Sequence, residues 1–274
     1  MDGQDQIFRH DSRSMSESAD ASALPASDLI ESVTRELVNR LVQQRQSSAS
    51  VTGMVEAPTD REIDDFCTAL TQDSGTRASG MFDDLRAGGK TSETICLGYI
   101  ASAARRLGEL WCSDDLGFLE VTLGLVRLHA MQREMQMDLV PRGVESNGLS
   151  ALLAPVPTET HVLGVVMAAG FFRRAGWAVD VFLEHDQDAL VAVAESGKYD
   201  LIGLSAGCRA VMPELQAIVP RLRELSPRPK IALGGFLTQL EPGIASELHV
   251  DGDLTDITTA PFSYQRRLTS VNAH

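Results

Sequence analysis

The chain is poor in cysteine and aromatic residues, and it has no excess of positive charge. Its four cysteines form no C-x-x-C pair and no spacing typical of a zinc site, so we expect reduced thiols in the core. The net charge of −14 is not offset by any basic stripe, which disfavours contact with nucleic acid. An effect of this protein on genes would therefore act through another protein.

Long apolar runs and an export signal are also missing. No run approaches the roughly 20 apolar residues that span a bilayer, and the N-terminal stretch is polar and acidic. We therefore expect a soluble protein that stays in the cytoplasm and does not contact a membrane. With 274 residues, the chain is long enough for two ordinary domains that each bury their own core.

Two common nucleotide-binding signatures are absent as well. The first expected strand is not followed by G-x-G-x-x-G, and G-x-x-x-x-G-K-[ST] occurs nowhere in the chain. A response-regulator receiver would place an acid at the end of its third strand, where this chain has Ser205. These absences argue against dinucleotide-binding, P-loop and receiver domains.

The N-terminal half predicts a helical bundle behind a tail. Residues 1–27 are rich in Ser, Asp and Ala and have little to bury, which predicts a disordered tail. Residues 28–139 repeat apolar residues at helical spacing, and their short connections favour antiparallel packing. The expected helices cover residues 28–45, 58–72, 76–89, 91–111 and 117–139.

The C-terminal half alternates between strand and helix patterns. It follows residues 140–150, a linker in which Pro, Gly, Ser and Asn cluster. Apolar runs of strand length, joined by helices, predict a parallel sheet with right-handed crossovers over residues 151–270. The expected strands are 151–156, 177–183, 200–206, 230–236 and 251–257, and the expected helices are 161–175, 188–196, 213–225 and 240–249. The last dozen residues show no clear pattern.

In such a sheet, ligands bind beyond the carboxyl ends of the strands, so the loops at that edge are the candidate site. The loop after the first strand contains His161, a good metal ligand. A ligating imidazole normally has its second nitrogen held by a carboxylate or a carbonyl, and Glu159 lies two residues before His161. Gly164, one turn into the following helix, leaves room beside the imidazole.

These residues form a recognisable pattern with two later loops. The sequence E-T-H-V-L-G at 159–164, followed by S-A-G at 205–207 and G-G at 234–235, resembles the signature D-x-H-x-x-G, S-x-L and G-G of cobalamin-binding domains. The resemblance covers about residues 150–270. It implies an α/β fold in which an N-terminal four-helix-bundle cap precedes a Rossmann-like (flavodoxin-like) parallel-sheet domain that binds cobalamin.

The resemblance also implies roles for individual residues. In that family, the histidine replaces the cofactor's own benzimidazole as the lower cobalt ligand, which implies this role for His161. The displaced nucleotide tail lies in a channel lined by the serine and glycine loops, here Ser205, Gly234 and Gly235. Further cofactor contacts are predicted for Glu159, Thr160, Val162, Gly164, Gly207 and Phe236.

The sequence departs from the family pattern at two positions. The aspartate of the family is Glu159 here, one methylene longer, which alters the hydrogen bond to His161 or exchanges it for another partner. The leucine of S-x-L is Gly207, which predicts a wider tail channel or a different hold on the nucleotide. Because some relatives of this domain are proposed to hold haem, haem remains an alternative cofactor.

The helical half resembles the cap of cobalamin photoreceptors, which carry W-x9-E-H over the upper face of the corrin. Here Trp111 is followed at that spacing by Val121 and Thr122, so the upper-face histidine is missing. This substitution resembles the AerR or PpaA group of antirepressors from purple photosynthetic bacteria. That resemblance implies a light-sensing regulator, not an enzyme, that acts on a repressor of the CrtJ or PpsR type. Phe118 is also predicted to lie over the corrin.

Several alternatives stay open at this point. The upper cobalt ligand is water, a carbon ligand, or one of His129, His10 and His185, and the sequence does not choose between hydroxo-, methyl- and adenosylcobalamin. His129 shares a helix face with Phe118 and Thr122 but lies about 10 Å further along it. The rival functions are a corrinoid methyl carrier for partner methyltransferases and a haem-binding redox sensor.

Overall fold

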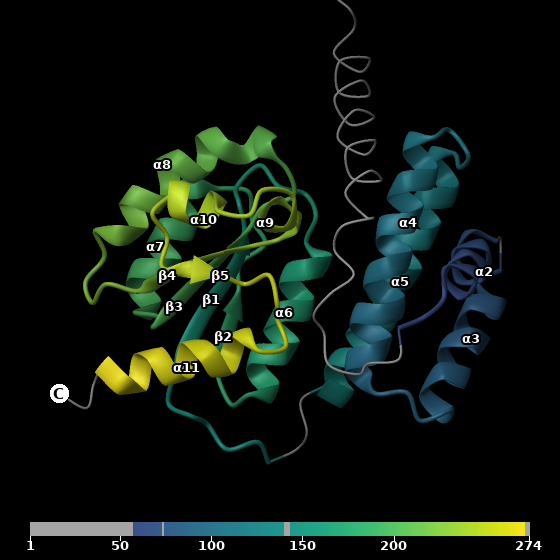
Figure 1. Ribbon diagram of the computed structural model, residues 1–274, viewed down its shortest axis with the longest axis horizontal. Helices are drawn as coiled ribbons and strands as arrows, with labels where there is room; N and C mark the ends of the chain where they lie inside the picture. The colour runs from purple at the N-terminus through teal and green to yellow at the C-terminus, as the bar shows by residue number, and fades with distance from the viewer. Residues whose placement is uncertain (1–56, 73, 140–142, 272–274) are drawn as a thin grey trace, which may run out of the picture.

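The computed structural model describes residues 57–72, 74–139 and 143–271 (Figure 1). The tail predicted for residues 1–27 and the helix predicted for 28–45 lie outside the described residues. Figure 1 shows a helical cap beside an α/β domain, with helix α6 between the sheet and the cap. Within the described residues, no helix is long and apolar enough to cross a membrane.

The cap contains the helices predicted for residues 58–139. Thr59 caps the first of them with a complete capping box, in which its hydroxyl oxygen accepts from the Glu62 amide and the Glu62 carboxylate accepts from the Thr59 amide. The elements are α2 (Asp60–Thr71), α3 (Thr76–Ala87), the π-helix η1 (Thr94–Ile100), α4 (Ala101–Cys112) and α5 (Phe118–Leu139).

The helix expected over 91–111 begins with a wider π-helical segment before α4. The Thr91 hydroxyl accepts a hydrogen bond from the Thr94 amide at 3.1 Å, so Thr91 caps this segment. Because residue 94 is a threonine and not an acid, there is no capping box here. Inside it, Gly98 lies so close to the Pro58 ring that a Cβ there would be 3.0 Å from the proline Cδ. The entering chain therefore packs directly against the first turns of this helix.

The α/β domain is built on a five-stranded parallel sheet, as predicted. The strands are β1 (Ser150–Pro155), β2 (Ala178–Val181), β3 (Leu201–Ser205), β4 (Lys230–Gly234) and β5 (Gly252–Asp253), in the order β2-β1-β3-β4-β5. The helices are α6 (Leu163–Arg174), α7 (Gln187–Gly197), the 3₁₀ helix η2 (Arg209–Val211), α8 (Met212–Arg223), α9 (Phe236–Leu240), α10 (Ile244–Glu247) and α11 (Ala260–Val271). The strand order reverses between β1 and β3, which places the ligand-binding edge there.

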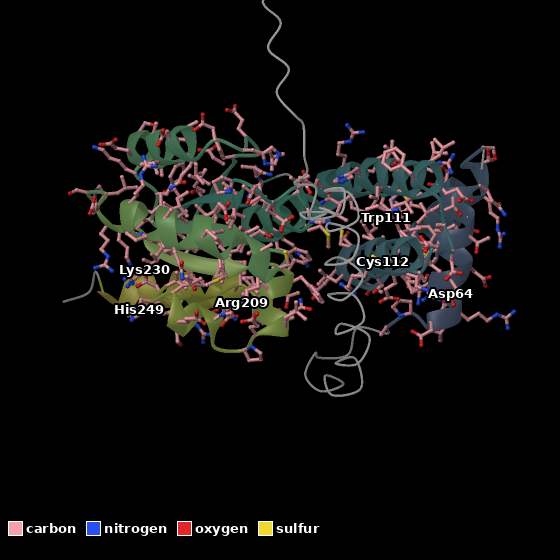
Figure 2. The ribbon with its side chains drawn as sticks, turned by 90° about the horizontal axis from the view of Figure 1, so that it is seen from above. Asp64, Trp111, Cys112, Arg209, Lys230 and His249 are labelled. Carbon is pink, nitrogen blue, oxygen red and sulfur yellow. The ribbon has the colours of Figure 1, made fainter. Side chains whose placement is uncertain are left out.

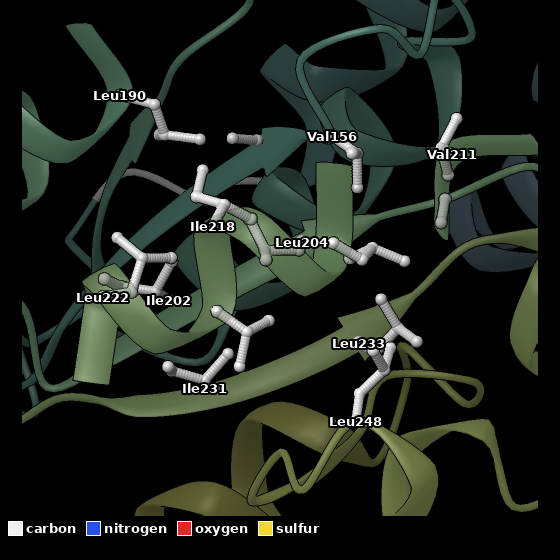
Figure 3. Close-up of a cluster of buried hydrophobic side chains, with 14 of the residues drawn as sticks. Val156, Leu190, Ile202, Leu204, Val211, Ile218, Leu222, Ile231, Leu233 and Leu248 are labelled. Carbon is white, nitrogen blue, oxygen red and sulfur yellow. The ribbon is translucent and has the colours of Figure 1, made fainter. Parts of the chain in front are cut away.

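Successive residues of the central strands enter different cores. Leu152 packs with Leu190 of α7 and Ile218 of α8, and Figure 3 shows this cluster. Leu153 packs on the opposite face with Phe172 of α6. Both faces of the sheet are thus covered by helices, which explains why its strands read as continuous apolar runs.

Two C-terminal elements differ from the prediction. The helix expected over 240–249 is shortened to α10, because Pro242 and Gly243 lie before it and Gly243 has a φ of +107°, while α9 already ends at Leu240 and begins at Phe236, where a strand was expected. Helix α11 covers residues 260–271, most of which belong to the stretch where the sequence showed no clear pattern. It is held by the Trp177 indole, which donates to the Pro261 carbonyl at 3.3 Å.

The cap and the α/β domain share a core through α6. Met167 and Phe171 of α6 belong to the apolar cluster of the cap, together with Met131 and Met135 of α5. The Gln136 side-chain amide adds a hydrogen bond to the Val166 carbonyl at 2.6 Å. The C-terminal half of α5 is therefore packed on the domain that carries the candidate site.

Candidate functional site

His161 lies in the loop between β1 and α6, two residues before the helix begins. Its side chain is 87% exposed, and its Nδ1 is 2.5 Å from the Glu159 Oε1. An ionised carboxylate can only accept a hydrogen bond, so the proton of this contact belongs to Nδ1. The imidazole is thereby fixed in the tautomer whose Nε2 lone pair is free to bind a metal.

The electrostatics of the pair show which partner carries the negative charge. Burial raises the pKa of the Glu159 carboxyl, but the hydrogen bonds from the side chain and backbone of His161 outweigh it, and the net pKa is lowered. The hydrogen bond to Glu159 raises the pKa of His161. Glu159 is therefore the ionised partner at neutral pH.

The Glu159 carboxylate connects two loops of the binding edge. The residue is 4% exposed, and its Oε1 also accepts from the His161 backbone amide at 2.9 Å. Its Oε2 accepts from the Gly207 amide, after β3, at 2.6 Å. The longer acid thus keeps the hydrogen bond to His161 and gains a second partner in the neighbouring loop.

Gly207 does not leave a wider channel, contrary to one expectation from the sequence. A Cβ at this position would be 2.5 Å from the Glu159 Oε2 and 3.3 Å from its Cδ. The space that a side chain at 207 would use is therefore filled by the carboxylate.

The serine and glycine loops meet beside this pair, as predicted. Ser205 is paired in register with both Pro155 and Gly234, so the three strand ends lie next to one another. Gly235 has a φ of +89°, and a Cβ there would be 2.5 Å from the Ala206 carbonyl oxygen. Only glycine suits that backbone and that close approach.

Two threonines that the sequence motif does not include lie behind these glycines. Thr238 is 7% exposed, and its hydroxyl donates to the Gly235 carbonyl at 2.7 Å. Thr255, after β5, contacts the same hydroxyl at 3.2 Å. The sequence could have indicated Thr238, because it lies three residues after Gly235 and a threonine hydroxyl can reach the carbonyl three residues before it. Thr160 is exposed and Val162 and Phe236 are half-buried at the same edge.

The cap residues predicted to cover the site divide into two groups. Trp111, Phe118 and Thr122 are exposed, the first two at 47% and 77%, whereas Val121 is buried at 8%. Gln136, which bonds to α6, lies five helical turns after Phe118 and therefore on the same face of α5. Phe118 and Thr122 thus lie on the side of α5 that faces the α/β domain, while Val121 lies inside the cap.

The alternative upper ligands are not equally placed. His129 is half-buried on the α5 face of Phe118, and burial followed by repulsion from Arg133 lowers its pKa. His185 is exposed in the loop after β2, and His10 lies outside the described residues.

Figure 2 places Trp111 in the cap and Arg209 on the α/β domain, where Arg209 pairs with Glu241.

Comparisons with known proteins identify the class of this site. Residues 149–258 match the family described as B12 binding domain. The chain is 31% identical over 162 residues to the "Uncharacterized 20.5 kDa protein in bchF-crtJ intergenic region" of Rhodobacter capsulatus, covering 57% of this chain and 83% of that protein. The chain belongs to the B12-binding family and, within it, resembles the AerR or PpaA group.

A solved structure has the same fold. The monomethylamine corrinoid protein of Methanosarcina barkeri matches with a TM-score of 0.64 at 14% identity, covering 76% of this chain and 99% of that chain. At this identity the likeness concerns the fold alone. It confirms a helical region followed by a Rossmann-like parallel sheet.

The residues at the edge of the sheet fit a cobalamin. The Nε2 of His161 would be the protein atom that binds its metal. A Cβ at Gly164 would meet no atom within 4 Å, so the surface beside His161 is open. At Gly235 the space for a side chain is already filled by the Ala206 backbone and the Ser205 hydroxyl, so glycine there lets the loops after β3 and β4 pack directly against each other.

Proposed function

We propose that this protein is a light sensor that binds cobalamin through His161 and acts as an antirepressor by contact with a repressor of the CrtJ or PpsR type. The observation that carries the proposal is the exposed His161 with its Nε2 free and its Nδ1 held by Glu159. The position of this imidazole on the surface of a B12-binding domain supports its use as a cobalt ligand.

Each part of the chain would contribute differently. His161 would bind from below, Ser205, Gly234 and Gly235 would line the tail, and Phe118 and Thr122 would face the upper side. When bound in its methyl or adenosyl form, cobalamin would supply a cobalt–carbon bond that light can break. The protein would respond to light by a shift of the N-terminal half of α5, since the C-terminal half of this helix is packed on α6.

The choice of partner rests on the relative from Rhodobacter capsulatus. That protein is named for its place in the bchF-crtJ intergenic region, next to the gene of such a repressor. The acidic net charge of −14 supports action through a protein and not directly on DNA. No catalytic constellation is needed for this role, and we propose a regulator without enzymatic activity.

The first test identifies the axial ligand. The full-length protein, labelled with ¹⁵N-histidine, is loaded with cobalamin and reduced to the Co(II) form, and its electron paramagnetic resonance spectrum is compared with that of unlabelled protein. Coupling to a histidine nitrogen that changes on labelling is expected, and His161→Ala should abolish it. His185→Ala is the matched control. If a nitrogen coupling that changes on ¹⁵N-histidine labelling is still present in His161→Ala, the assignment of His161 as the ligand is refuted.

The second test concerns light and the partner. Binding of the purified repressor is measured by surface plasmon resonance for protein loaded with hydroxo-, methyl- or adenosylcobalamin, in darkness and after illumination. We expect an affinity that changes with light in the wild type and does not change in His161→Ala. An affinity independent of light in all three forms would overturn the photosensor proposal.

One rival has a specific observation in its favour. The fold of the Methanosarcina barkeri corrinoid protein suits a methyl carrier equally well. A methyl-transfer assay with reduced, cobalamin-loaded protein and a corrinoid methyltransferase separates the two functions. Turnover in that assay without a light response would favour the carrier, and a haem spectrum in the purified protein would favour the redox sensor.

A further inference from the structure

The two departures from the B12-binding motif touch each other. Glu159 Oε2 accepts the Gly207 amide hydrogen at 2.6 Å, and the same oxygen occupies the space where a Cβ on residue 207 would lie. The two residues are far apart in the sequence, and nothing in the motif itself relates them.

Glycine at 207 is required by space and not by backbone conformation. Gly207 is not among the glycines with a left-handed φ, unlike Gly235 at +89°. An alanine could therefore adopt the same backbone. Its Cβ, however, would be 2.5 Å from the carboxylate oxygen, well inside the 3.4 Å at which ordinary contact begins. Either the carboxylate or the β3 loop would have to move.

A displaced carboxylate would act directly on His161. The imidazole is 87% exposed, so packing contributes little to its orientation. The bond from Nδ1 to Glu159 Oε1, at 2.5 Å, and the bond from the His161 amide to the same oxygen, at 2.9 Å, fix the ring and the loop together. A shift of about 1 Å in the carboxylate would weaken both bonds.

We infer that Gly207 is a positioning residue for His161, which acts through Glu159, and that the longer acid and the missing side chain are a matched pair. Glu159 needs the extra methylene to reach across to the β3 loop, and it needs Gly207 to have room there. A shorter acid at 159 would leave the Gly207 amide without its partner. The geometric part of this inference is independent of the ligand, whereas its effect on cobalamin rests on the proposed function.

The test is a double-mutant cycle on the full-length chain. Wild type, Glu159→Asp, Gly207→Ala and the double variant are compared first without cofactor, by the NMR shifts of the residue 207 amide proton and of the His161 Nδ1 proton. The residue 207 amide proton should lose its strong hydrogen-bond shift in each single variant, and the His161 Nδ1 proton should lose its shift in Gly207→Ala, where the carboxylate is displaced. In the double variant, the smaller acid and the larger residue fit together, and the His161 proton shift should return towards its wild-type value.

The second readout is the affinity for hydroxocobalamin. Loss of the residue that orients a metal-binding histidine typically weakens metal affinity about 10- to 100-fold, so each single variant should bind at least tenfold more weakly. The double variant should bind more tightly than either single variant. Gly80→Ala is the control, because a Cβ there meets nothing within 4 Å and the residue lies on α3, away from the site.

The outcomes separate the inference from the function. If the NMR shifts of the two single variants are unchanged, or the effects simply add in the double variant, the matched pair is refuted. If the NMR cycle shows the coupling but the wild type binds no cobalamin, the pair stands and the proposed function fails. If all three variants bind hydroxocobalamin as tightly as the wild type, the role of Gly207 in positioning His161 is refuted.

Discussion

An exposed histidine is useful as a metal ligand only when something holds its ring, and His161 has little packing to do so. Its orientation depends on a single buried carboxylate, which makes Glu159 as important to the site as the ligand itself. Beside it, Gly164 leaves the space next to the imidazole free of side chains.

Gly164→Ala separates folding from binding at this site. A Cβ at Gly164 meets no atom within 4 Å, and the residue lies in the first turn of α6. Alanine should therefore raise the free energy of unfolding of the cofactor-free protein by about 0.5–1 kcal/mol, as measured in urea. Cobalamin affinity should fall about tenfold, because the new methyl group projects into the predicted cofactor space.

Gly80→Ala is the matched control for this variant, since it lies in α3 and is equally open. It should show the gain in stability without any change in cobalamin affinity. Unchanged affinity in Gly164→Ala would show that the cofactor does not lie against α6.

At the scale of the helices, α5 contains an unusual buried group. Gln132 is 0% exposed, and neither atom of its amide has a hydrogen-bond partner within the described residues. Replacing it by leucine removes two unsatisfied polar atoms, so Gln132→Leu should raise the free energy of unfolding by about 1–2 kcal/mol. Urea denaturation of the cofactor-free protein measures this change.

Gln136→Leu is the control one turn further along α5. Its amide donates to the Val166 carbonyl, so that substitution should lower the free energy of unfolding by about 1 kcal/mol. A loss of stability in Gln132→Leu of the same size would mean that the Gln132 amide has a partner in solution.

The junction of β4 and β5 predicts a pH dependence. Burial raises the pKa of Asp251, but hydrogen bonds from the Ile231 amide and from Lys230, each at 3.0 Å, outweigh it and lower the net pKa. A lowered pKa stabilises the fold above the unfolded value of 3.8, and this contribution disappears as the pH falls through the folded pKa.

Asp251→Asn should therefore lower the free energy of unfolding by about 1 kcal/mol at pH 7. The difference from wild type should shrink as the pH falls below 4, which urea titrations at several pH values would measure. Glu195→Gln, an exposed carboxylate on α7, is the control. A difference that stays constant with pH would contradict the role of the ionised carboxylate.

The elements that could be predicted from the sequence are those with a strong local signal. The central strands were predicted because both faces are buried, and α2 was predicted from Thr59 and its apolar stripe. Helix α11 was missed because its order comes from a distant contact, the Trp177 indole on Pro261. The place of His161 could be read from its motif, but the contact between Glu159 and Gly207 could not, because it depends on how two loops approach in space.

For the whole molecule, two adjacent phenylalanines decide how the cap is attached. Phe171 belongs to the core of the cap, whereas Phe172 packs against Trp177 in the core of the sheet, with ring centroids 5.2 Å apart. One turn of α6 therefore joins two cores, and we expect the cap and the α/β domain to unfold together.

The two tryptophans of the chain allow a direct test. Trp111 lies in the cap and Trp177 in the sheet domain, so the variants Trp177→Phe and Trp111→Phe each leave one probe. In an otherwise unchanged protein both probes should report the same urea midpoint. Adding Phe171→Ala, which removes a side chain that is 5% exposed, should cost about 3–4 kcal/mol and make the cap probe unfold first.

Phe172→Ala is the comparison for that experiment. It should cost a similar amount but act mainly on the sheet domain, so the Trp177 probe should shift at least as far as the Trp111 probe. Identical midpoints for both probes in Phe171→Ala would show that the cap is held by other contacts.

The contact between Glu159 and Gly207 also bears on the ancestry of the sequence. A comparison that scores every motif position separately counts two unrelated mismatches here, although one exchange in space accounts for both. Either change alone would pass through an ancestor with a crowded carboxylate or with an unpaired amide at residue 207. We therefore expect the two changes to be inherited together, so that lineages carry either the short acid with a side chain opposite, or the long acid with glycine.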